Sequence, residues 1–180
     1  FDLRAEEAEH MIEALIFVIF PLCLAISACI DLLTMTIPNR VSVILLAAFL
    51  IVAPFAGLGF AEIGLHLLAG LLVFAICFGL FVANVMGGGD AKLLTAAAVW
   101  FGFNSSLEMF MIYVGLIGGL VTVLVLLIRA HANSAIAVGV PLPPSLFAAK
   151  KIPYGVAIGI AGFLAYPSSP LMVAALHRLH

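Results

Sequence analysis

The hydrophobic residues of this chain fall into long, almost uninterrupted runs. Runs of about 20 apolar residues have the length of a helix that crosses a lipid bilayer. Polar, glycine or proline residues separate the runs. We therefore expect an all-α, polytopic membrane helix bundle of about six transmembrane spans, broken at a glycine run next to Asp90. The expected spans cover residues 11–30, 41–55, 63–86, 93–103, 107–128 and 154–176.

The fourth and sixth runs differ from the others. The fourth has only 11 residues, over 93–103. At ~1.5 Å per residue it is too short to cross a hydrocarbon core of ~30 Å. Either this helix begins inside the membrane, near Asp90, or it spans only part of the bilayer. In the sixth run we expect Pro167 and Pro170 to kink or split the helix.

Composition supports a membrane protein and excludes several other classes. Of the 180 residues, 66% are hydrophobic and 9% are charged, and the mean hydropathy is +1.33. The three cysteines form neither a Cys-x-x-Cys pair nor a zinc-binding pattern, and no basic patch favours nucleic acid. We expect an acidic extracytoplasmic segment over residues 1–10 and a single membrane-embedded domain over residues 11–178.

The positive charges predict an orientation. With both termini outside the cytoplasm, five cations lie on inner segments and two on outer segments, which satisfies the positive-inside rule. The inner cations are Arg40, Lys92, Arg129, Lys150 and Lys151, and the outer ones are Arg4 and Arg178. The same topology places Asp31 and Asp90 together on the inner side, although 59 positions separate them in the sequence.

Asp31 and Asp90 are the main candidates for chemistry. They are two of only three aspartates in the chain, and both lie in apolar sequence. A carboxylate at membrane depth is costly and therefore indicates a functional site. Two carboxylates in contact share one proton, because like charges so close cannot both ionise. The ionised member activates a water and the protonated member donates to a scissile carbonyl, as in an aspartic protease.

The aspartates also have simpler explanations. Asp90 precedes an alanine-rich helix and could be its N-cap, because aspartate is a favoured cap. Asp31 is harder to explain in this way, since the helix dipole disfavours an anion at a helix C-terminus. The glycines before Asp90 would let the chain break at membrane depth and let a substrate backbone approach. Lys92 would either pair with Asp90 or anchor its helix at the inner surface.

Three motifs in this order resemble the type IV prepilin peptidases, which are membrane aspartic proteases of the Gly-x-Gly-Asp class. The first is Asp31 with Thr-Ile-Pro-Asn at 36–39, and the second is Gly-Gly-Gly-Asp-Ala-Lys-Leu at 87–93. The third is Lys-Ile-Pro-Tyr-Gly-Val-Ala-Ile at 151–158. The chain looks most similar to the short branch of the family that serves Tad/Flp-type pili.

The resemblance implies a catalytic pair, a substrate and a location. Asp31 and Asp90 would be the catalytic residues of an endopeptidase that needs no cofactor. It would remove the leader peptides of Flp-type prepilins and of pseudopilins at the cytoplasmic face of the bacterial inner membrane. Other motif positions would support the site or the approach of the substrate: Pro38, Asn39, Gly87, Gly88, Gly89, Lys92, Pro153, Tyr154 and Gly155.

Departures from related enzymes narrow the expected activity. Larger prepilin peptidases carry a cytoplasmic segment with paired Cys-x-x-Cys motifs and also methylate the new N-terminus with S-adenosylmethionine. Those cysteines are missing from this sequence, so we expect neither methyltransferase activity nor a metal. Presenilin-like relatives would show Tyr-Asp before the first aspartate and a late Pro-Ala-Leu. Here Ile30 precedes Asp31, and residues 152–155 occupy the late position.

Two other classes of function stay open at this point. A proton-coupled small membrane transporter could use Asp31 and Asp90, because intramembrane carboxylates and broken helices also build ion sites. Transporters often show two matched broken segments, however, and one glycine break is evident here. A scaffold subunit, whose aspartates only pair helices, is the third hypothesis. The sequence leaves the oligomeric state undetermined.

Overall fold

The computed structural model describes the backbone of residues 2–131 and 152–178, and the side chains of residues 11–131 and 152–177. Most of the expected connector between the fifth and sixth runs lies outside these residues. So do the side chains of the acidic N-terminal segment, which therefore remains a prediction.

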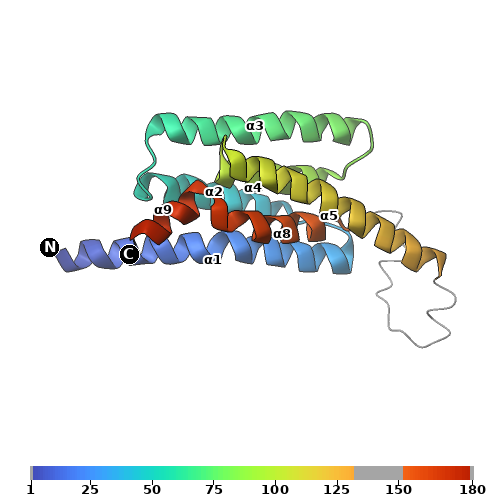
Figure 1. Cartoon of the computed structure of the whole chain (residues 1–180), viewed down its shortest axis with the longest axis horizontal. Helices are drawn as coiled ribbons and strands as arrows, with labels where there is room; N and C mark the ends of the chain where they lie inside the picture. The colour runs from blue at the N-terminus through green and yellow to red at the C-terminus, as the bar shows by residue number, and fades with distance from the viewer. Residues whose placement is uncertain (1, 132–151, 179–180) are drawn as a thin grey trace.

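All the secondary structure in the described residues is helical, as predicted (Figure 1). The helices are α1 (Asp2–Thr34), α2 (Asn39–Phe55), α3 (Phe60–Val82), α4 (Gly88–Phe101), α5 (Ser105–Ala130), α8 (Tyr154–Ala165) and α9 (Pro170–Arg178). A short 3₁₀ segment, η1 (Tyr166–Ser168), joins the last two. The start of α1 and the end of α9 lie at one end of the bundle (Figure 1). The end of α1, the α3–α4 connection and the start of α8 lie at the other.

The lengths of the helices confirm a multi-pass membrane protein. Among the described residues, three helices are long and apolar enough to cross a bilayer: α1 from Met11, α3 and α5. The α8–α9 pair makes a fourth if it is counted as one bent span. Helix α2 is apolar but has only 17 residues, and α4 has 14. The predicted number of six spans therefore stays a prediction.

The last two helices show the predicted effect of proline. Helix α8 ends at Ala165, and the chain bends by 44° before α9 continues from Pro170. Pro167 lies in the 3₁₀ segment and Pro170 is the first residue of α9. Proline has no backbone N–H and is tolerated in the first turn of a helix but not in its interior. The split of the sixth run is confirmed.

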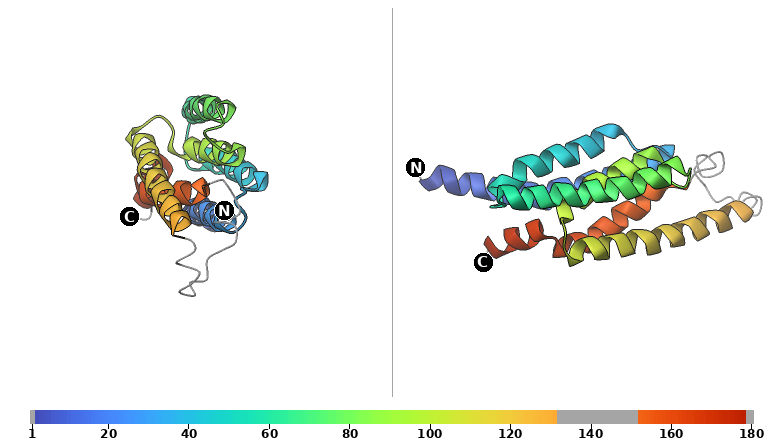
Figure 2. Two further views of the ribbon diagram at one scale, coloured as in Figure 1. Left: turned by 90° about the vertical axis from the view of Figure 1, so that its right-hand side faces the viewer. Right: turned by 90° about the horizontal axis from the view of Figure 1, so that it is seen from above.

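Helix α4 is the core of the bundle. It lies among α2, α3 and α8, and nearly every residue after Asp90 is buried (Figure 2). Its alanines let the neighbouring helices approach closely, while Trp100 and Phe101 fill the space at its end. The Trp100 indole N–H donates to the carbonyl of Leu45 at 3.0 Å. Because other helices enclose it, α4 can be shorter than a membrane span and still begin beside Asp90.

Helix α8 packs closely on α1 because it presents glycines to it. A Cβ on Gly159 would lie 3.1 Å from Cβ of Ala28, and one on Gly162 would overlap the side chain of Leu24. Small residues at such positions let helix backbones approach in membranes. The close packing continues to Gly155, which lies against Asp31. The end of α1 is thereby held against the start of α8.

The end of α4 depends on a glycine in an unusual conformation. Gly102 has φ 66° and ψ −170°, a region that side chains rarely adopt. A Cβ there would also lie 2.7 Å from the ring of His66. His66 is buried, stacks on Phe49 and donates from Nδ1 to the carbonyl of Val99 at 2.7 Å.

We expect Gly102→Ala to destabilise the fold by ~1–3 kcal/mol through backbone strain alone. Gly119→Ala is the matched control, because a Cβ at that position meets nothing within 4 Å. Thermal unfolding in detergent should show a lower midpoint for the first variant and an unchanged one for the second. Equal midpoints for Gly102→Ala and wild type would contradict this account of the α4 terminus.

Candidate active site

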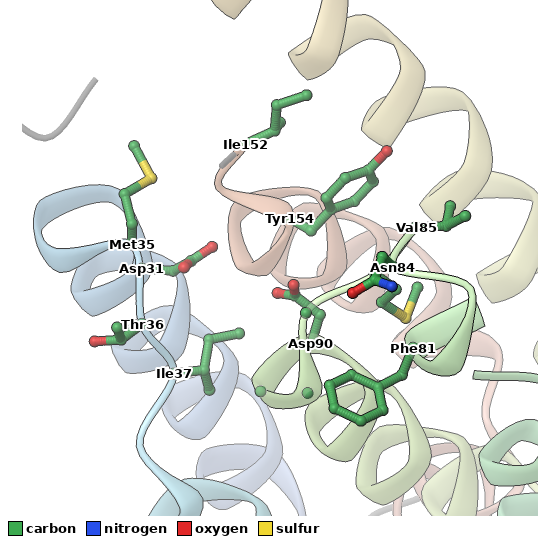
Figure 3. Close-up of a pocket in the computed structure, with 14 residues that line it drawn as sticks. Asp31, Met35, Thr36, Ile37, Phe81, Asn84, Val85, Asp90, Ile152 and Tyr154 are labelled. Atoms are coloured by element: carbon green, nitrogen blue, oxygen red, sulfur yellow. The ribbon is translucent and has the colours of Figure 1, made fainter. Parts of the chain in front are cut away.

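Both aspartates line one cavity of about 540 Å³ at the end of the bundle (Figure 3). The wall comes from the end of α1, the α1–α2 connection, the end of α3, the α3–α4 connection, the first turn of α4 and the start of α8. The volume is many times the ~30 Å³ share of one water, so the cavity has room for water beside the two carboxylates. The structure thus brings together two residues that are 59 positions apart.

Asp31 lies in the last turn of α1 and is only 4% exposed. The backbone N–H of Gly155 donates to its Oδ2 at 2.7 Å. Gly155 is the second residue of α8, and a helix N-terminus favours a nearby anion. The C-terminus of α1 disfavours the negative charge of Asp31, but the N-terminus of α8, which favours an anion, lies against it.

Asp90 is the third residue of α4, and its side chain points into the same cavity (Figure 3). The N-cap position belongs to Gly87, so the explanation of Asp90 as a cap is wrong. The chain also breaks earlier than predicted. Helix α3 ends at Val82, and the connection after it contains Asn84 with φ 57°. Asparagine adopts this left-handed conformation more readily than most residues do.

The three glycines before Asp90 differ in their surroundings. A Cβ on Gly87 would lie 2.6 Å from Oδ2 of Asp90. A Cβ on Gly89 would lie 3.2 Å from Cβ of Ile37. A Cβ on Gly88 would instead meet the ring of Phe81, at 3.3 Å. The outer two glycines therefore leave room for the carboxylate and for the α1–α2 connection, whereas the middle one faces α3.

Ile37 links the three motifs and was not among the predicted site residues. It lies against Gly89 of α4, and its Cδ1 lies 3.0 Å from the Cβ position of Gly155 in α8. The next residue, Pro38, is extended and precedes α2, as Pro153 precedes α8. An isoleucine in so apolar a chain carries no signal of its own, and only its place inside the 36–39 motif could have indicated it.

Not all the other predicted site residues line this cavity: Lys92 and Asn39 line a second one, between α2 and α4. Nζ of Lys92 donates to Oδ1 of Asn39 at 3.0 Å, which ties α4 to the start of α2. The two roles expected for Lys92, pairing with Asp90 and anchoring its helix at the inner surface, stay predictions. Tyr154 lines the cavity, and its hydroxyl lies 3.5 Å from that of Thr122. The lining residues that were not predicted as site residues are Met35, Thr36, Ile37, Phe81, Asn84, Val85, Met86 and Ile152.

The chemistry available in this cavity is that of carboxylates and backbone amides. In the described part of the chain, no three His, Cys, Asp or Glu side chains are grouped so that they could hold a metal ion. Two carboxylates from different helices instead face one space (Figure 3). Such a pair can accept and donate protons to a bound water and a peptide carbonyl.

Comparison with known families agrees with this site. The type IV leader peptidase family matches residues 18–127, well over half of the chain. The chain belongs to the type IV leader peptidase family. The match includes Asp31 and Asp90 and confirms the predicted prepilin peptidase family, whose members are peptidases of the aspartic type. The Tad/Flp branch stays a prediction. Neither curated proteins nor solved structures gave a match.

We expect Gly155→Ala to lower the peptidase activity of this family member roughly 100-fold, because sub-ångström placement controls the rate. The new Cβ would lie 2.9 Å from both Cβ and Oδ2 of Asp31 and would displace that carboxylate. Gly115→Ala is the control, since its Cβ meets nothing within 4 Å. Initial rates of leader cleavage at equal protein concentration measure the effect. Similar rates for both variants would contradict the role given to Gly155.

The glycine triplet should show a graded response. Gly87→Ala forces Asp90 to rotate and should reduce cleavage at least about tenfold, whereas Gly88→Ala meets only a ring edge and should stay within about threefold of wild type. Neither glycine has a positive φ, so backbone strain does not complicate the comparison. The opposite order of activities would show that Gly87 does not act through the Asp90 carboxylate.

Proposed function

We propose that this protein is an aspartic endopeptidase that cleaves the leader peptides of Flp-type prepilins and of pseudopilins. One observation carries the proposal: Asp31 and Asp90 line a single cavity in a member of the leader peptidase family. The site lies at the cytoplasmic face of the bacterial inner membrane, and both termini are extracytoplasmic. The distribution of positive charges supports this orientation.

In the proposed reaction, the two carboxylates hold one proton between them and a water lies between them and the scissile bond. The ionised carboxylate takes a proton from the water as its oxygen attacks the peptide carbonyl. The protonated carboxylate donates to the carbonyl oxygen, which gives a tetrahedral diol. When the diol collapses, the ionised carboxylate takes a proton from a diol hydroxyl, the C–N bond breaks, and the protonated carboxylate donates to the leaving nitrogen, so the pair again holds one proton. No covalent bond to the enzyme forms.

The surroundings of Asp31 assist this cycle. The Gly155 N–H and the start of α8 stabilise negative charge on Asp31 while the shared proton resides on Asp90. Asp90 belongs to the first turn of α4, beside a connection that carries no regular helix. A substrate backbone can therefore approach Asp90 over the glycines without meeting side chains from residues 87–89.

A transporter that uses the same two aspartates is the alternative. Family membership favours the peptidase, and none of the described contacts favours transport over hydrolysis. The two functions separate in detergent, where no ion gradient exists. Purified protein that cuts a prepilin under those conditions acts as a protease. The absence of the paired Cys-x-x-Cys motifs supports cleavage without methylation.

We expect Asp31→Asn and Asp90→Asn each to reduce prepilin cleavage at least about 100-fold, because each removes one proton-transfer group. An immunoblot of a co-expressed Flp-type prepilin separates precursor from mature pilin. Glu108→Gln, which neutralises an exposed carboxylate at the start of α5, is the control and should process the prepilin normally. Full processing by either aspartate variant, at equal abundance, would end the proposal.

A further inference from the structure

A second cavity, the α2–α3 groove, lies along the side of the bundle. It has a volume of about 420 Å³ and is open over much of its length. Its walls are formed by α2 and α3, which make few contacts with each other, and its floor is formed by α4. The residues that line it are Asn39, Ser42, Val43, Leu46, Phe74, Lys92, Thr95 and Ala96.

Helical periodicity shows that three helix faces converge on this groove. On α2 the lining residues recur at spacings of three and four, as do those on α4, so each set lies on one face. On α3, Phe74 is followed one turn later by Phe78 and then by Phe81. Their rings are in contact, with centroids 5.7 Å and 6.4 Å apart. The three rings are 39–51% exposed, so the row is open to its surroundings.

A row of exposed phenylalanine rings on α3 runs from the groove to the catalytic cavity. Phe74 lines the groove, whereas Phe81, two turns further along the same row, lines the cavity with Asp31 and Asp90. Phe81 also lies against Gly88, on the same face of α4 as Lys92. A chain that leaves the catalytic cavity along Phe81 therefore passes Phe78 and reaches the groove at Phe74 (Figure 3 shows Phe81 beside the start of α4).

We propose that the α2–α3 groove binds the hydrophobic segment of the peptide substrate that follows the scissile bond. This inference rests on the proposed function and adds the surface that holds the substrate in the membrane. Phe81 follows Phe74 by seven positions, which corresponds to ~10 Å or two helical turns. The substrate would place its first two apolar turns against α3 while its cleavage site lies between the aspartates.

The composition of the groove suits a helix. Thr95 and Ala96 on the floor are small, and small residues let helix backbones approach closely in a bilayer. Val43 and Leu46 supply an apolar wall opposite the phenylalanine rings. The hydroxyl of Ser42 is buried in the wall and has no hydrogen-bond partner in the described part of the chain.

Lys92 closes one end of the groove. Lys92 follows Asp90 by two positions in the sequence, and its ammonium group donates a hydrogen bond to Asn39. An anionic phospholipid, with its phosphate on Lys92 and one chain along the rings, is the competing occupant. The row of rings that leads from the groove to the catalytic cavity favours the substrate, because a lipid site has no need to extend toward the two aspartates.

Photocrosslinking tests which occupant is present. Two variants of the Asp90→Asn protein are compared. In the first, p-benzoylphenylalanine replaces Phe78. In the second, it replaces Leu120, an exposed residue of α5. Each protein is reconstituted in phosphatidylethanolamine and phosphatidylglycerol vesicles with a purified prepilin. We expect irradiation to join position 78 to the segment after the cleavage site and to give no such product from position 120. Products with lipid alone, or equal yields from both positions, would overturn the proposal.

A groove-filling variant gives a kinetic test. Val43→Trp should lower kcat/KM for the full prepilin at least about tenfold, because it removes binding by a remote part of the substrate. The control Leu120→Trp should stay within about twofold of wild type. A soluble peptide that ends shortly after the cleavage site does not reach the groove, so Val43→Trp and wild type should cleave it equally. Loss of both activities would indicate a misplaced active site rather than a filled groove.

Failure of this inference can be distinguished from failure of the proposed function. If wild-type protein does not cut the prepilin, the proposed function is wrong and the groove has a different occupant. If wild-type protein cuts the prepilin but position 78 crosslinks only to lipid, the proposed function stands and the substrate segment lies elsewhere.

Discussion

The close approach of α8 to α1 is the contact on which the site depends. Glycines at 155, 159 and 162 bring the two helices together, and at one end of this interface the Gly155 amide donates to Asp31. An aspartate at the C-terminus of its own membrane helix is costly. The start of α8 offsets that cost with a backbone donor and a favourable helix end. Without this packing, Asp31 would be a buried charge at the wrong end of α1.

The second aspartate depends on a different constraint, the enclosure of α4. Because α2, α3 and α8 surround it, α4 need not cross the bilayer, and its first turn can carry Asp90 into a cavity. Ile37 connects the two constraints, since it lies against Gly89 in α4 and Gly155 in α8. The three motifs therefore pack against one another at this point. The first contributes Ile37, and the second and third contribute the glycines that leave room for it.

Much of this arrangement follows from the sequence. Apolar runs predicted the helices, prolines predicted the split before α9, and positive charges predicted that Asp31 and Asp90 lie on one side. Local patterns could not show which side chains fill the space between motifs, so Ile37, Phe81 and Asn84 were missed. The sequence also left open whether Asp90 caps α4 or lies in its first turn, because a favoured cap and a first-turn acid look alike in sequence. The number of membrane spans is also hard to predict from the lengths of apolar runs, because a short helix such as α4 can be enclosed by other helices.

The central claim is that Asp31 and Asp90 act as one coupled pair that shares a proton. Kinetics of the two single asparagine variants and of the double variant test this claim most directly, because residues that act as a unit show non-additive losses. If the pair is coupled, the double variant should retain about the same residual cleavage rate as either single variant. Losses that multiply in the double variant would show two independent contributions and would contradict the claim.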